Sequence, residues 1–243
     1  MAPPRNPAAP AAGTEPLSHV RHWVFDLDNT LYPATCDLFR QIDRRMGAYI
    51  ARLLALGPEE ARRVQKRYFR AYGTTLRGLM IHHRVDPRAY MAYVHDIDLT
   101  VMAPDPTLDA ALAALPGPKT VFTNASRAHA VQVLERLGIA RRFGAIFDIH
   151  DAGYLPKPEP ETYRRFIADH GVVAAETALF DDTAANLAPA AELGMTTVLV
   201  RPGEDGIDND PAAPHVHHVA DDLAGWLGAV ARARARPGGS GSV

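Results

Sequence analysis

Residues 22–32 read His-Trp-Val-Phe-Asp-Leu-Asp-Asn-Thr-Leu-Tyr and decide the fold of this 243-residue chain. The apolar run from Trp23 to Phe25 predicts a buried strand that leads directly into two carboxylates, Asp26 and Asp28. Because side chains in a strand repeat with a period of two, both acids lie on the same side, with Cα atoms roughly 6–7 Å apart. One acid can then engage a substrate atom while the other engages its leaving group. A solvated turn explains an isolated Asp-x-Asp equally well, so the remaining strand ends decide between the two.

The overall composition is that of an ordinary soluble globular protein, with 47% hydrophobic and 22% charged residues. The 26 Lys and Arg against 28 Asp and Glu leave a net charge of −2, which gives no global field favouring nucleic acid or an anionic membrane. The single cysteine excludes an intramolecular disulfide and a cysteine-rich zinc site. No apolar stretch approaches the ~18 residues that span a bilayer. We therefore expect a cytoplasmic protein without a nucleic-acid polymer or membrane partner; its oligomeric state is left open.

Strands and helices are predicted to alternate along most of the chain. Five nearly continuous apolar runs predict buried strands at His22–Asp26, Lys119–Asn124, Ala145–His150, Thr177–Asp182 and Thr196–Val200. Helical spacing of apolar residues predicts helices at Ala128–Leu137, Pro160–His170 and Thr183–Leu193. This alternation implies right-handed crossovers and a mainly parallel sheet, so the predicted fold class is α/β.

A long insertion separates the first two predicted strands. Its helical patterns are Leu38–Leu56, Glu59–Tyr72, Asp86–Asp98 and Thr107–Leu115. A helical lobe inserted here lies over the carboxyl end of the first strand, where ligands bind in open α/β sheets. The predicted division is a disordered leader at 1–19, a core made of 20–32 and 119–230, a helical cap at 33–118, and a flexible tail at 231–243.

The ends of three further predicted strands also carry polar side chains. They are Thr123, Asn124, Ala125 and Ser126 after the second strand, Lys157 after the third, and Asp181 and Asp182 at the fourth. The second group stands at a predicted helix start, where hydroxyl, amide and backbone N–H groups can hold an anion. Four carboxylates at one edge repel one another unless a cation shares the site, and oxygen-only ligands suit Mg²⁺ beside a phosphate. Each group alone is explained by a turn or a cap, but together they predict phosphoryl transfer.

This order of motifs resembles the haloacid dehalogenase superfamily over roughly residues 22–203. Asp26 to Thr30 resemble its first motif, Thr123-Asn124 the second, Lys157 the third and Asp181-Asp182 the fourth. The resemblance implies a Rossmann-like core with a helical cap inserted after the first motif. It also implies an Mg²⁺-dependent hydrolase that acts through an aspartyl-phosphate.

The resemblance assigns a role to each motif residue. Asp26 would be the nucleophile, and Asp28 the general acid and then the base for the hydrolytic water. Since a halide leaving group needs no proton, an acid at Asp28 favours a phosphatase or a phosphomutase over a dehalogenase. Mg²⁺ would be held by the carboxylates of Asp26, Asp181 and Asp182 and by the backbone carbonyl of Asp28. The phosphate would be held by Lys157, Thr123 and the backbone at Asn124 and Ala125.

The predicted cap indicates which branch of the superfamily the chain resembles most. The segment 68–79 is similar to the cap of the pyrimidine 5′-nucleotidase branch, which implies a pyrimidine nucleoside monophosphate such as UMP or CMP as substrate. Gly73 and Gly78 predict a break between helices that carries Thr74, Thr75 and Arg77 toward the substrate; a plain helix connection explains the same residues. Three alternatives stay open: a phosphatase of another small ester such as phosphoglycolate or a sugar phosphate, a phosphomutase, and a non-catalytic phosphate-binding module.

Overall fold

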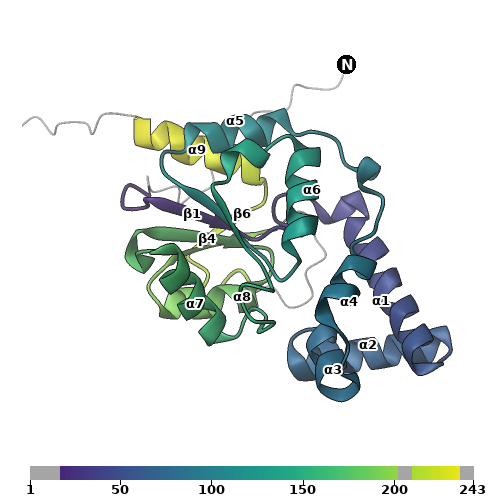
Figure 1. Cartoon of the computed structure of the whole chain (residues 1–243). Helices are drawn as coiled ribbons and strands as arrows, with labels where there is room; N and C mark the ends of the chain where they lie inside the picture. The colour runs from purple at the N-terminus through teal and green to yellow at the C-terminus, as the bar shows by residue number, and fades with distance from the viewer. Residues whose placement is uncertain (1–16, 202–209, 236–243) are drawn as a thin grey trace, which may run out of the picture.

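The computed structural model describes residues 17–201 and 210–235 and contains a parallel six-stranded sheet (Figure 1). The strands are β1 (His22–Phe25), β2 (Lys119–Phe122), β3 (Ala145–Phe147), β4 (Thr177–Asp181), β5 (Thr196–Val200) and β6 (His218–Ala220). Their order is β3-β2-β1-β4-β5-β6, and every neighbouring pair is parallel. The predicted α/β class is confirmed. Since the strand order reverses beside β1, the carboxyl end of β1 lies at the switch point where such sheets bind ligands.

The helices of the described residues follow the predicted pattern in most places. They are α1 (Leu38–Leu54), α2 (Pro58–Tyr72), α3 (Thr75–His83), α4 (Pro87–Val94), α5 (Pro106–Ala114), α6 (Arg127–Leu137), α7 (Pro160–His170), α8 (Ala184–Glu192) and α9 (Leu223–Ala235). Four of them begin with a proline, which has no N–H to leave unpaired in the first turn. None of the helices within 17–201 and 210–235 has both the length and the apolar character needed to cross a membrane.

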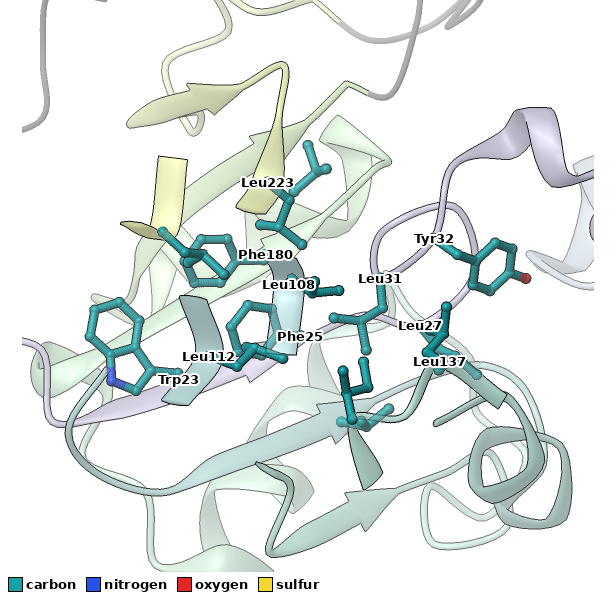
Figure 2. Packing of buried hydrophobic residues seen from close by; sticks show 14 of the residues in the cluster. Trp23, Phe25, Leu27, Leu31, Tyr32, Leu108, Leu112, Leu137, Phe180 and Leu223 are labelled. Carbon is teal, nitrogen blue, oxygen red and sulfur yellow. The ribbon is translucent and has the colours of Figure 1, made fainter. Parts of the chain in front are cut away.

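Buried apolar side chains hold helices on both faces of the sheet. Figure 1 shows α5, α6 and α9 on one face and α7 and α8 on the other. Side chains of β1 alternate between these layers, since Phe25 belongs to the first cluster and Val24 to the second. In the first layer the rings of Phe25 and Phe180 stack with centroids 4.6 Å apart, next to Trp23 (Figure 2). β1 is therefore packed on both faces, which fixes the position of the carboxylate that follows it.

Helices α1 to α4 form a separate helical lobe with its own apolar core (Figure 1). We call this lobe the cap. Within it α1 packs on α2 and α4, and α2 packs on α3. The same apolar cluster includes the buried side chain of Ile149, which follows β3. The cap therefore rests on the segment that leads from β3 toward Lys157.

The structure differs from the prediction at four points, and one of them is α9, a helix that the sequence analysis did not predict. The break predicted around residues 73–78 is shorter than expected, because α3 begins at Thr75 and Gly78 lies inside it. Helix α5 was placed in the cap, but it packs on α9 and belongs to the apolar cluster of the sheet; we therefore propose that the cap ends after α4. Strand β6 was not predicted, because its three residues form no buried apolar run.

The predicted leader and tail lie partly within the described residues. Leu17 is buried, and its carbonyl accepts a hydrogen bond from Arg234 at the end of α9. Residues 17–19 and 231–235 are thus part of the folded core. The rest of the predicted leader (1–16) and of the predicted tail (236–243) lies outside the described residues.

Candidate active site

A buried lysine joins the ends of three strands at the switch point. The Lys157 ammonium donates to Asp26 Oδ1 at 2.8 Å, to Asp181 Oδ2 at 2.6 Å, and to the carbonyl of Phe122 at 2.9 Å. The Lys157 side chain is only 1% exposed. β1, β4 and β2 supply these three acceptors, so residues far apart in sequence meet as the motif order predicts.

The position of Lys157 is fixed by the side chain of Asn124. Asn124 Oδ1 accepts from the Lys157 backbone N–H at 2.8 Å, and its Nδ2 donates to the Lys157 carbonyl at 3.2 Å. Next to it, the buried Thr123 hydroxyl accepts from the backbone N–H of Ala125 at 3.0 Å. The resemblance gave only the backbone of Asn124 a role. Its side chain holds the loop that carries Lys157, which sequence spacing does not reveal because the two residues are 33 positions apart.

The fourth-motif acids differ in how they are held. Asp181 is fully buried, and its Oδ1 accepts from the backbone N–H of Thr183 at 3.0 Å and from Asn186 Nδ2 at 2.9 Å. Asp182 is partly exposed. Asp26, Asp181 and Asp182 each offer a carboxylate oxygen, and these oxygens lie within 4.8 Å of one another.

The charges of this site are not balanced by the residues present. Burial raises the pKa of Asp26 well above its ordinary value, and Lys157 offsets this only in part while the neighbouring acids add to it. Burial, followed by repulsion from Asp181, raises the pKa of Asp182 to about 7. Burial lowers the pKa of Lys157, but Asp181 and Asp26 outweigh it, so the ammonium stays charged. One cation thus faces three carboxylates.

This donor set fits a hard divalent cation. Three carboxylates converge with no nitrogen or sulfur donor among them, and burial, together with repulsion between the acids, raises the pKa of Asp26 and Asp182. Mg²⁺ prefers such oxygen ligands and keeps open positions for water or phosphate. The side chain of Asp28 is not part of this group of oxygens, so its predicted role as a ligand rests on its backbone carbonyl alone.

Mg²⁺ is expected to stabilise the metal-free protein, and to do so more at about pH 8 than at about pH 5. The folded-state pKa values of Asp26 and Asp182 lie above the unfolded value, so the folded state binds more protons. The contribution of these two groups to stability is therefore complete below about pH 4 and is lost as the pH rises through about 7. At 100 times Kd the ion adds about 2.7 kcal/mol, a melting shift of about 5–10 °C.

Calorimetry of the chelator-treated protein with and without Mg²⁺ measures this shift. Asp182→Asn should reduce both the shift and its pH dependence, because it removes one of the three charges. A shift of equal size at both pH values in the unmodified protein would contradict the assignment.

Asp28 lies apart from the three carboxylates and has its own partners. Its Oδ1 accepts from the Tyr32 hydroxyl at 2.5 Å and lies 3.1 Å from His129 Nε2. Burial raises the pKa of this carboxyl, but the charge and hydrogen bond of His129 and the hydrogen bond of Tyr32 outweigh it, so the pKa lies below its ordinary value. The sequence gave no signal for His129, which is 101 residues away along the chain.

The three predicted substrate residues of the cap make other contacts. Thr74 caps α3, and its hydroxyl accepts from the Arg77 backbone N–H at 3.2 Å. Thr75 is buried and donates to the Gln65 carbonyl at 3.3 Å. The Arg77 guanidinium forms an ion pair at 2.8 Å with Glu159, two residues beyond Lys157. The two threonines thus make contacts within the cap, whereas Arg77 joins the cap to the loop that carries Lys157.

Comparison with solved structures shows a shared fold. The L-2-haloacid dehalogenase from Xanthobacter autotrophicus has a TM-score of 0.57 and 18% identity, with 88% of this chain and 97% of that chain covered. A HAD phosphatase from Thermococcus onnurineus has a TM-score of 0.55 and 17% identity, with 83% and 94% covered. At these identities the likeness concerns the fold alone, and it includes both dehalogenases and a phosphatase.

Sequence comparisons place the chain in a family. Phosphate metabolism protein 8 from Saccharomyces cerevisiae is 27% identical over 193 residues, which are 73% of this chain. The match spans 60% of the length of that relative. The model of the haloacid dehalogenase-like hydrolases matches residues 20–194, which include all four motifs. The chain therefore belongs to the haloacid dehalogenase-like hydrolase family.

Proposed function

We propose that the protein is an Mg²⁺-dependent phosphomonoesterase that forms a phosphoryl–Asp26 intermediate. The observation that carries this proposal is the Lys157 ammonium held between Asp26 and Asp181 at the switch point. A positive charge fixed beside a carboxylate nucleophile opposes the negative charge of a phosphoryl group. All three N–H donors of Lys157 are used by Asp26, Asp181 and Phe122 in this geometry, so it acts on phosphate through its charge unless one bond is exchanged.

The reaction proceeds in two displacements at phosphorus. In the first, the Asp26 carboxylate forms a bond to phosphorus, the bond to the leaving oxygen breaks, and Asp28 gives that oxygen a proton. In the second, Asp28 takes a proton from water, the water oxygen bonds to phosphorus, and the bond to Asp26 breaks. The products are the alcohol and inorganic phosphate, with both acids restored.

The metal and the substrate set the ionisation that these steps need. Mg²⁺, held by Asp26, Asp181 and Asp182, would supply the positive charge that keeps Asp26 ionised and neutralises phosphoryl oxygens. A phosphate dianion beside Asp28 raises the pKa of that carboxyl by like-charge repulsion, which favours the protonated form required for the first step. The low pKa of Asp28 in the free protein suits the basic form required for the second.

The environment of Asp28 favours a phosphatase over a dehalogenase. Displacement of a halide needs no proton donor, whereas an alkoxide leaving group does. In this chain an acid stands two residues after the nucleophile, and two buried side chains, Tyr32 and His129, hold it in place. This arrangement supports an oxygen leaving group.

For the substrate we propose a pyrimidine nucleoside monophosphate, on the similarity of the cap segment 68–79 and of the first and fourth motifs to the pyrimidine 5′-nucleotidase branch. Phosphate release from UMP and CMP should exceed that from phosphoglycolate and glucose 6-phosphate by at least about tenfold in kcat/KM, about 1.4 kcal/mol. Chelation of Mg²⁺ should abolish it. A colorimetric phosphate assay over this panel makes the measurement, with Asp26→Asn as the blank.

The other outcomes of the panel identify the alternatives. Preference for phosphoglycolate or a sugar phosphate would replace the nucleotide substrate and leave the reaction unchanged. Formation of a sugar phosphate isomer without free phosphate would indicate a phosphomutase. Binding of phosphate without turnover of any compound would indicate a non-catalytic module.

A further inference from the structure

Two histidines connect the proposed proton donor to the cap. His129, in the first turn of α6, is buried, and its Nε2 lies 3.1 Å from Asp28 Oδ1. The ring of His95, which follows α4, stacks on the ring of His129 with centroids 4.3 Å apart and planes tilted by 16°. His95 Nδ1 lies 2.9 Å from the hydroxyl of Ser126, the N-cap of α6. The residue that follows the last helix of the cap therefore fixes the plane of the ring that contacts Asp28.

The contact with Asp28 is the only polar contact that the His129 ring makes within the described residues. Nε2 faces an ionised carboxylate, which only accepts, so Nε2 carries a proton and donates to Asp28. Nδ1 is buried without a hydrogen-bond partner in the described part of the chain. A ring that served packing alone would be more stable without this unpaired nitrogen. The buried imidazole is thus explained by its hydrogen bond to Asp28.

The two donors to Asp28 determine which of its oxygens can carry a proton. Tyr32 and His129 both contact Oδ1. Among the described residues, no hydrogen bond reaches Oδ2. Two hydrogen bonds to one oxygen restrict the orientation of the carboxyl group and leave Oδ2 as the oxygen that can carry the transferred proton.

We propose that His129, whose ring plane is fixed by stacking on His95, is a positioning residue. It orients the Asp28 carboxyl so that Oδ2 can give its proton to the leaving oxygen. The proposal rests on the function proposed above, in which Asp28 is the general acid. It adds that the acid is aligned through the pair His95–His129, in which His95 directly follows the last helix of the cap. Its effect is confined to steps in which Asp28 transfers a proton.

Leaving groups of different basicity test this role. p-Nitrophenolate departs without a proton, whereas an alkoxide does not, and kcat/KM covers the steps up to departure. His129→Phe keeps the ring and removes the donor. It should lower kcat/KM for UMP by about 10²-fold and for p-nitrophenyl phosphate by less than about threefold. His129→Gln, which returns an amide N–H, should recover most of the UMP activity.

His95 provides a matched pair of variants. His95→Ala removes the stack and should give the same selective loss at smaller size, whereas His95→Phe keeps an aromatic ring and should exceed His95→Ala in UMP activity. Thermal melting of each variant shows whether it is folded at the assay temperature. An equal loss on both substrates, or no loss on either, would overturn the positioning role. Failure of the unmodified protein to hydrolyse both substrates would instead overturn the proposed function.

Discussion

Asp26→Asn is expected to lower phosphate release by at least about 10⁴-fold while the protein stays folded. An amide cannot form the bond to phosphorus, so the first displacement stops. The fold should tolerate the change, because burial raises the pKa of Asp26 and so disfavours its ionised form. Asparagine has nearly the same shape and carries no charge. Lys157 keeps Asp181 as a partner. Phosphate release and a thermal melt of the same sample make the measurement.

The control for this variant is Asp169→Asn, on the exposed side of α7. It makes the same chemical change far from the strand ends and should leave activity within about twofold. If Asp26→Asn retained full activity with Mg²⁺ bound, Asp26 would not be the nucleophile.

Lys157→Met is expected to destabilise the protein by about 3–5 kcal/mol and to abolish activity. The substitution keeps the volume of the side chain but leaves the buried carboxylates Asp26 and Asp181 without their cation. Without the Lys157 charge the folded-state pKa of Asp26 rises further, so stability is lost as the pH rises; the destabilisation should be larger at about pH 8 than at about pH 5. Denaturant unfolding of the metal-free protein at both pH values gives the difference.

Lys119→Met is the matched control. Lys119 is also buried, but among residues 17–201 and 210–235 its ammonium donates only to the carbonyls of Leu115 and Gly117. Its loss should cost about 1 kcal/mol. If both variants lost the same stability with no dependence on pH, the carboxylates around Lys157 would not carry the charge assigned to them.

The core of the fold follows from local patterns in the sequence. The strands from His22, Lys119, Thr177 and Thr196 are buried on both faces, so each appears as a nearly continuous apolar run. α7 begins and ends as expected, between Pro160 and the C-cap Gly171. Where an element depends on its tertiary setting the prediction fails, as for β6, whose edge position requires no apolar run.

The candidate site likewise contains residues that the sequence predicts and contacts that it does not. Asp26, Lys157 and Asp181 follow buried strands of one parallel sheet, so the sequence predicts that they meet at one edge. The Asn124 clamp and the His129 contact depend instead on how loops and α6 settle against that edge. Nothing in the spacing of these residues reports those contacts. Thr75 shows the opposite case, since a hydroxyl expected at the substrate is used inside the cap.

The most direct test of the mechanism is to trap the phosphoryl group on Asp26. Asp28→Asn with p-nitrophenyl phosphate should allow the first displacement, which then needs no acid, and block the second, which needs a base. We expect a burst of one nitrophenolate per protein, and peptide mass mapping after an acid quench should place a phosphoryl group on Asp26. Phosphate release by this variant with no label on Asp26, or a label on another residue, would contradict the account.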